Sequence, residues 1–249
     1  MLNLNRRQWL AAGTALGVAP LSPAQALPSW LRFAVSDTWA APYLVVSSGA
    51  PVGGLLYELM LAIAAEAGAR PQFVRLPNQR VDAALLSGDV DLHCMLSAQW
   101  YEGPLPGRLG PPMVDLEDVL VMRGPGPAVE LQAQRGLRVG TVLGYRYESL
   151  LDAFASGALV REDAPSQQLV MEKLRLGRTE AAIVDRRVLQ HFNRDRLAGD
   201  RLHARQRIAH TVTHGCVSSR SAWPQERLMQ ALERVVSSGA LRRLLDRPA

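Results

Sequence analysis

The sequence has few cysteines, no long apolar run and no long run of like charges. Cys94 and Cys216 are its only cysteines, so at most one disulfide can form within the chain. A disulfide, two buried free thiols, and a metal site with His93 and His214 all remain open at this stage. The formal net charge of +5 over 249 residues is too weak, without a run of five like charges, to indicate nucleic-acid binding.

Common enzyme signatures are also missing. The chain contains no G-x-S-x-G, no H-E-x-x-H, no P-loop and no C-x-x-C, the motifs of many hydrolases, metalloproteases, nucleotide-binding proteins and redox proteins. The composition is 48% hydrophobic and 20% charged, which is the ordinary range for globular proteins. The sequence therefore predicts a globular protein with few enzyme signatures, and we expect it to need no cofactor.

The first 26 residues have the pattern of an export signal. Arg6 and Arg7 give a basic start, an apolar stretch of modest length follows, and Ala24 and Ala26 form an A-x-A cleavage pattern. The apolar stretch is too short to span a bilayer permanently. Because there is no cysteine near the cleavage site, we do not expect a lipid anchor there. We expect a cleaved signal at 1–26, of the secretory or the twin-arginine type, and a soluble protein in the periplasm.

The remainder alternates strand and helix patterns. Short apolar runs predict strands, and an i, i+3, i+4 recurrence of apolar residues predicts a helix that ends at Gly68. Asn78 is the predicted N-cap of a second helix, which ends at Gly88. This alternation predicts an α/β protein with a largely parallel sheet. The expected elements are strands at 31–37, 71–76 and 90–96 and helices at 53–68 and 78–88.

The scheme then restarts, which predicts two lobes. "LRVGTVLG" at 137–144 echoes "LRFAVSD" at 31–37, and "EKLRLGRTEAAIVD" echoes "ALLSGDVDLHC", with Glu180 at the place of Asp91. Two echoes in the same order favour two lobes built to one plan. After a Gly/Pro-rich stretch at 103–112, the remaining predicted elements are strands at 118–124, 201–208 and 210–219 and a helix at 224–236.

We expect the last segment to return to the first lobe. Lobe 1 is then predicted at 27–118 and 213–249, and lobe 2 at 119–212, with hinges near 116–123 and 208–217. A ligand cleft is expected between the lobes, where strand ends and helix starts converge.

The order of these motifs resembles the family 3 periplasmic solute-binding proteins, the receptors of polar amino-acid ABC importers. The likeness covers nearly all of 31–245 and includes "APYL", "GLLYEL", "ALLSGDVDL", "RVGTVLGYRYESLL" and "GRTEAAIVDRRVL". It implies a two-lobed α/β fold of the type II kind that closes about its two hinge crossovers on a bound solute. The implied partners are a small polar solute and a membrane permease or sensor, and the protein is expected to be a monomer.

The resemblance also implies a role for Asp185. In amino-acid-binding members, the second acid of the matching segment holds the ligand's ammonium group, and Asp185 occupies that place. A carboxylate at a strand end in a partly desolvated cleft requires a cationic or hydrogen-bonding partner. The competing interpretation is that Asp185 caps the next helix or pairs with Arg186 or Arg187.

Other candidate ligand-binding residues lie on both lobes. Flat side chains pack well against a solute's apolar body, and amides at the start of a helix suit an anion. The candidates other than Asp185 are Trp39, Tyr43, Ser97, Gln99, Trp100, Gly144, Tyr145 and Arg146.

The segment "CMLSAQWYEGPLPGR" departs from the family pattern. Amino-acid receptors have Thr-Pro-Glu-Arg there, and the arginine binds the ligand carboxylate, whereas this chain has no arginine before Arg108. An unpaired buried carboxylate costs several kcal/mol. Either Arg108 or Arg146 replaces that arginine, or the solute is not a standard α-amino acid.

The predicted function is capture of a small polar solute, an amino acid or a related amine or carboxylate, for an importer. Two alternatives remain. One is a periplasmic module that docks on a sensor, and the other is an enzyme that resembles the cyclohexadienyl dehydratases of this fold, with Glu102, His93 or Glu148 as an acid.

Overall fold

The computed structural model describes residues 28–247. Its main sheet has eight strands in the order β4-β1-β5-β10-β6-β9-β7-β8. Strand β1 is parallel to β4 and β5, and β7 is parallel to β8 and β9, whereas β10 and β6 are antiparallel to their neighbours. The strands are β1 (Trp30–Ser36), β4 (Arg70–Leu76), β5 (Leu92–Leu96), β6 (Arg108–Met122), β7 (Leu137–Val142), β8 (Leu159–Ala164), β9 (Ala181–Asp185) and β10 (His203–Val217).

Helices cover both faces of this sheet. One continuous apolar cluster packs five helices on one face, and smaller clusters place α2 and α3 on the other. The helices are α1 (Leu55–Ala67), α2 (Val81–Ser87), α3 (Leu151–Ala155), α4 (Gln167–Arg175), α5 (Arg186–Asn193), α6 (Gln225–Ser237) and α7 (Ala240–Leu245). A separate exposed hairpin consists of β2 (Val45–Ser47) and β3 (Ala50–Gly53).

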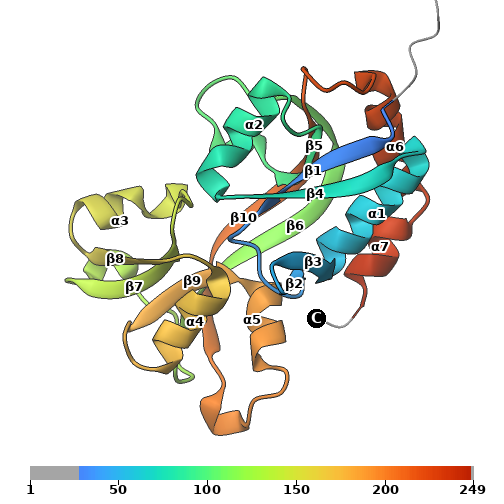
Figure 1. The fold of residues 1–249 in the computed structure, drawn as a ribbon. Coiled ribbons are helices and arrows are strands. Elements are labelled where there is room, and N and C mark those ends of the chain that lie inside the picture. The colour runs from blue at the N-terminus through green and yellow to red at the C-terminus, as the bar shows by residue number, and fades with distance from the viewer. Residues whose placement is uncertain (1–27, 248–249) are drawn as a thin grey trace, which may run out of the picture.

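The molecule has two lobes joined by two long strands. Figure 1 shows β1, β4, β5 and α2 in one lobe and β7, β8 and α3 in the other, with β6 and β10 running between them. These two strands pair from His203 and Met122 to Val217 and Arg108. The α/β class and the two-lobed architecture predicted from the sequence are therefore confirmed.

Several local predictions need correction. The predicted strands 201–208 and 210–219 are one strand, β10, and β6 begins at Arg108 within the Gly/Pro-rich stretch. Both β10 and β6 pair with a neighbouring strand on each side along the sheet. Strand β8 and the β2–β3 hairpin were not predicted.

The caps of the predicted helices agree in part with the structure. Gly68 and Gly88 end their helices in the left-handed conformation, as predicted. Asn78 does not cap α2: its side-chain oxygen accepts a hydrogen bond from Ser36 Oγ at 3.0 Å, and a 3₁₀ turn separates it from the helix. The tertiary partner in β1 therefore replaces the local role expected of Asn78.

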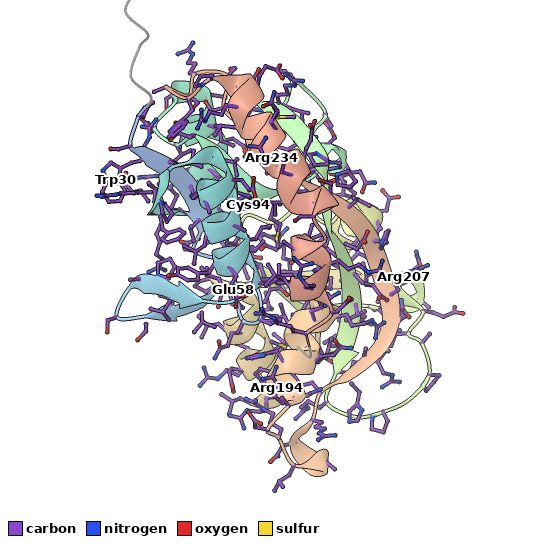
Figure 2. All side chains as sticks on the ribbon, turned by 90° about the vertical axis from the view of Figure 1, so that its right-hand side faces the viewer. Trp30, Glu58, Cys94, Arg194, Arg207 and Arg234 are labelled. Carbon is purple, nitrogen blue, oxygen red and sulfur yellow. The ribbon has the colours of Figure 1, made fainter. Side chains whose placement is uncertain are left out.

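Cys94 and Cys216 are buried free thiols. Cys94 packs in the cluster beneath α1 and α6, where Figure 2 shows it in the interior, and Cys216 packs in the cluster beneath α2. Side chains on opposite faces of a sheet cannot reach each other. Burial raises the pKa of the Cys216 thiol to about 12 and raises that of Cys94 as well. Among residues 28–247, no group of three potential ligands that could hold a metal ion is found.

The predicted export signal at 1–26 lies outside the described residues. Within 28–247, none of the helices has both the length and the apolar character needed to cross a membrane.

Candidate functional site

A cavity of about 290 Å³ lies between the two lobes. Its walls come from the loops that follow β1, β4, β5 and β7, from strands β5, β6 and β9, and from the first turns of α2 and α4. A cavity of this size is at the low end of small-molecule sites. Its lining residues are Trp39, Ala40, Tyr43, Asn78, Gln79, Val81, Asp82, His93, Met95, Leu96, Trp100, Tyr101, Leu116, Asp118, Gly144, Tyr145, Arg146, Gln167 and Asp185.

Seven of the nine predicted site residues line this cavity, and two do not. The seven are Trp39, Tyr43, Trp100, Gly144, Tyr145, Arg146 and Asp185. Ser97 is buried, and its hydroxyl oxygen accepts the Gln99 amide at 3.4 Å, which caps a 3₁₀ turn. The Gln99 side chain is exposed. The geometry therefore gives no support to solute contact by Ser97 or Gln99.

Asp185 stands at the carboxyl end of β9 and is the N-cap of α5. Its Oδ1 accepts hydrogen bonds from the amides of Arg187 and Val188 at 2.9 and 3.3 Å, and Oδ2 accepts one from the Glu117 amide at 3.1 Å. The helix-capping interpretation of Asp185 is thus present in the structure. Pairing with the arginine side chains is not, because Arg186 binds Glu117 instead.

Asp185 also receives a hydrogen bond across the cleft. The Tyr43 hydroxyl donates to Oδ1 at 3.0 Å, and Tyr43 follows β1 on the opposite lobe. Asp185 is only 2% exposed, and burial raises the pKa of its carboxyl group although the four donors act in the opposite direction. Burial, followed by the nearby Asp185 charge, raises the pKa of Tyr43 well above its usual value. The raised pKa of Tyr43 keeps its phenol protonated, so that it can donate this hydrogen bond.

The loop after β7 forms the second wall of the cavity. Gly144 has a φ of 80°, which favours glycine, and a β-carbon there would lie 3.1 Å from Gln79 Cγ on the other lobe. The Tyr145 hydroxyl makes a 3.0 Å hydrogen bond with Thr38 Oγ1, which also crosses the cleft. Burial raises the pKa of Tyr145 to about 12. The two lobes therefore touch at this loop.

The anion site expected from the amides of Tyr145 and Arg146 gains little support from this loop. The Tyr145 amide donates to the Val142 carbonyl at 3.1 Å, so it is not free for a solute. The helix that follows, α3, has only five residues and is preceded by a 3₁₀ turn. The Arg146 guanidinium is held by Glu102 of the opposite lobe and by Glu148. This rim residue thus contacts the first lobe and offers no free charge.

Arg108 does not replace the arginine that the family pattern would supply. It lies at the start of β6 and pairs with Glu226 in α6, and it does not line the cavity. Of the described residues that do line the cavity, Arg146 is the one with a permanently cationic side chain.

The first-lobe wall is aromatic. Trp39 stacks on His93, with ring centroids 5.1 Å apart. The His93 ring nitrogens face the carbonyl oxygens of Ala34 and Met95 at 3.0 and 3.1 Å. Burial lowers the pKa of His93, and a neutral ring can donate to only one of these carbonyls.

Several polar lining residues were not predicted as site residues from the sequence, among them Asp82, Asp118 and Gln167. Asp82, in the first turn of α2, accepts a 2.6 Å hydrogen bond from the Tyr101 hydroxyl, and Gln167 accepts the Asp185 amide at 2.7 Å. Asp118 lies opposite Asp185 in the β6–β9 ladder. For Asp118, the only signal in the sequence was its place at the start of the apolar run "DVLVM". An acid at that place is common where strands begin, so it does not indicate a site.

Comparison with known proteins gives similar structures only. No protein-family model and no curated protein matches the chain. An ancestral arginine-binding protein bound to arginine matches with a TM-score of 0.72 and 17% identity over 90% of this chain and 99% of that one. The chain has the periplasmic-binding-protein fold. At this identity, the likeness establishes the fold and leaves the solute open.

Two further matches are a periplasmic binding protein and a kinase sensor domain. An arginine-specific periplasmic binding protein of Salmonella typhimurium has a TM-score of 0.72 and 16% identity over 88% of this chain and 98% of that one. A histidine kinase sensor domain with similarity to periplasmic binding proteins has a TM-score of 0.71 and 21% identity over 88% and 95%.

Proposed function

We propose that this protein is an exported solute-binding protein that closes its two lobes on a small polar solute. Lobe 1 comprises 27–118 and 213–249, lobe 2 comprises 119–212, and the solute occupies the cavity between them. The closed form is presented to a membrane permease, and the protein acts in the periplasm as a monomer.

The observation that carries this proposal is the pair of hydrogen bonds across the cleft. Tyr43 binds Asp185, and Thr38 binds Tyr145, each at 3.0 Å. Both bonds join the rims of a cavity whose lining is shared by the two lobes. Lobes that separate must break these contacts, so a solute that fills the cavity and contacts both walls shifts the population toward closure.

A sensor role is the second candidate. The similar histidine kinase sensor domain shows that this fold also operates attached to a signalling protein. The two roles share the closing step and differ in the partner that reads the closed form. Capture of a permease or of a sensor kinase by the closed protein would separate them.

Catalysis has weak support. Of the three acids considered from the sequence, Glu102 and Glu148 are bound to Arg146. His93 is buried against two backbone carbonyl groups. None of these side chains is a free acid that faces the cavity, whereas general acid catalysis requires a proton within hydrogen-bonding reach of the substrate.

The proposal is tested by measuring closure. Small-angle X-ray scattering of residues 27–249 is recorded with and without each solute that raises the melting temperature in a screen of amino acids, amines, carboxylates and sugars. A solute at one hundred times its Kd stabilises the folded protein by roughly 2.7 kcal/mol. We expect the radius of gyration to fall with such a solute. Stabilising solutes that leave the radius unchanged would overturn the proposal.

A matched pair of variants locates the closing contact. Tyr43→Phe removes only the hydroxyl that binds Asp185, and Tyr57→Phe removes a hydroxyl in α1 where the ring packs on Phe73. A hydrogen bond to a charged group contributes roughly 1.5–3 kcal/mol, so we expect Tyr43→Phe to weaken solute binding by about tenfold. Tyr57→Phe should bind like the parent protein.

A further inference from the structure

The cavity has an excess of negative charge. Asp82, Asp118 and Asp185 all line it, and the cationic side chain among its described lining residues, Arg146, is already bound by two glutamates at the rim. A solute carboxylate in this space would face three carboxyl groups and would find no unpaired cation. A charge left unpaired in a closed site is strongly disfavoured.

Asp118 is the unsatisfied member of this group. Asp185 accepts four hydrogen bonds and Asp82 accepts one from Tyr101. Within residues 28–247, the Asp118 carboxyl group has no hydrogen-bond donor and no ion-pair partner. Asp118 is partly exposed and lines the cavity, so its carboxyl group is available to a partner that enters the cavity from outside the chain.

Asp118 and Asp185 point to the same place. They are directly opposite in the antiparallel β6–β9 pair, so their side chains leave the same face of the sheet, with β-carbons about 5 Å apart. Burial, and then the charge of Asp185, raises the pKa of Asp118 to about 7. A cation placed between the two carboxyl groups would compensate for their burial and for the repulsion between their charges.

The walls also suit a cation. Trp39, Tyr43, Trp100 and Tyr145 line the same cavity as the two acids. The faces of aromatic rings attract ammonium and guanidinium groups, and binding proteins use such walls to hold amines. The acidic side chains and the aromatic walls both favour a positively charged solute.

We propose that the solute is a small organic cation without a carboxylate group, whose charged nitrogen lies between Asp118 and Asp185. This inference rests on the proposed function and goes further, since it excludes the α-amino acids themselves. Asp118 supplies the counter-charge, Asp185 supplies a second carboxylate that is held by α5 and Tyr43, and the aromatic walls enclose the apolar part of the solute.

The test uses pairs of compounds that differ by one carboxylate. Isothermal titration calorimetry of residues 27–249 compares agmatine with arginine, cadaverine with lysine, histamine with histidine, and choline with glycine betaine. We expect the amine of at least one pair to bind at least tenfold more tightly than its carboxylated partner. An amino acid that binds as tightly as its amine, or more tightly, would overturn the inference.

The same panel separates this inference from the proposed function. A neutral or anionic solute that compacts the protein, while every amine fails to bind, overturns the cationic class and leaves solute capture intact. If no solute of any class compacts the protein, both fail.

Asp118 is tested against an acid on the same strand. Asp118→Asn keeps the shape of the side chain and removes its charge, and Asp115→Asn makes the same change at an exposed position that pairs with His210. We expect Asp118→Asn to weaken binding of the best amine at least tenfold and Asp115→Asn to change it less than twofold. Asp118→Ser, checked for folding by circular dichroism, serves as a second variant. Unchanged amine binding in both folded Asp118 variants contradicts the inference.

Discussion

Each lobe has an acid just before its last parallel strand that binds the backbone of the neighbouring strand. The two acids differ in how deeply they are buried. In lobe 1, the Asp91 carboxylate accepts the Arg32 amide at 2.8 Å, and in lobe 2 the Glu180 carboxylate accepts the Arg138 amide at 3.1 Å. In the reverse direction, the amides of Asp91 and Glu180 donate to the carbonyl groups of Arg32 and Arg138. The internal echo in the sequence therefore corresponds to one repeated structure.

The surroundings of the two acids differ. The Asp91 side chain is 1% exposed and also binds the Arg32 guanidinium and the Ser221 hydroxyl. The Glu180 side chain is 53% exposed, and its ion pair with Arg138 is 3.8 Å long. The same sequence position is thus a buried anchor in lobe 1, where the C-terminal segment returns to cover it, and a surface residue in lobe 2.

The strands that follow these acids end differently as well. With the lobes aligned in this way, Leu96 at the end of β5 corresponds to Asp185 at the end of β9, and both line the cavity. One lobe places an apolar side chain at this point, and the other places a carboxylate. The shared scaffold positions the cavity, and the asymmetry at the strand ends gives it charge.

The largest expected effect separates the two anchoring acids. Asp91→Ala removes a buried acceptor from the partly exposed Arg32 and Ser221 donors, so we expect the free energy of unfolding to fall by about 2–4 kcal/mol. Glu180→Ala should lower it by less than about 1 kcal/mol, because exposed ion pairs contribute little. Urea unfolding of both variants measures this difference. Equal losses of unfolding free energy would show that the two acids stabilise their lobes equally.

The next effect makes the two strand ends alike. Asp185→Leu copies lobe 1 into lobe 2, and it removes the cap of α5 and the acceptor of the Tyr43 hydroxyl. We expect a loss of about 2 kcal/mol of stability and no measurable solute binding. Asp185→Asn retains an oxygen acceptor and should lose less than about 1 kcal/mol. Thermal unfolding and calorimetry report the two quantities, and solute binding by the leucine variant would contradict the assignment of Asp185 to the site.

A third effect concerns the pH dependence of stability. Because the pKa of Asp118 is raised from 3.8 to about 7, the folded protein holds a proton that the unfolded chain releases between these values. The contribution of this group to stability is therefore highest at low pH, falls as pH rises from about 4 to 7, and is constant above that range. The acid that faces Asp118 across the ladder is Asp185, and the other charged groups on the cavity are Asp82 and Arg146.

Asp118→Asn should remove this pH dependence. At pH 3.5 we expect the variant to be about as stable as the parent, and at pH 8 to be more stable by about 1–3 kcal/mol, a range reduced for solvent in the cleft. Guanidinium unfolding at both pH values measures the difference. A variant that is less stable than the parent at pH 8 would show that Asp118 is stabilised as an anion.

The smallest effect lies where the lobes meet at the rim. Glu102→Gln removes one of the two carboxylates that hold Arg146, and both side chains are largely exposed. We expect the free energy of unfolding to change by less than about 0.5 kcal/mol and solute affinity to change by less than about threefold. Dependence of this change on salt concentration identifies the ion pair, because screening weakens exposed pairs. A tenfold loss of affinity would instead make this contact part of the binding site.

Much of the fold followed from local patterns. The leucine periodicity of α1, the glycines at 68 and 88 and the two echoed motifs are short-range features, and they identified the α/β class and the two lobes. The length of β10 did not follow, because its continuity depends on pairing with β5 and β6 along both edges. Asn78 failed as a cap for the same reason, since its partner Ser36 is distant in the sequence.

The sequence by itself determined the repeated strand and helix plan and the presence of Asp185 at a strand end, since periodicity, glycine stops and motif order are properties of neighbouring residues. The tertiary structure decided the character of the site. It tied Arg108 and Arg146 to glutamates, left Gln99 outside the cavity lining and placed Asp118 opposite Asp185. These outcomes depend on which side chains from distant segments line the same cavity. The burial and the charge of each lining side chain depend on all the others that line it.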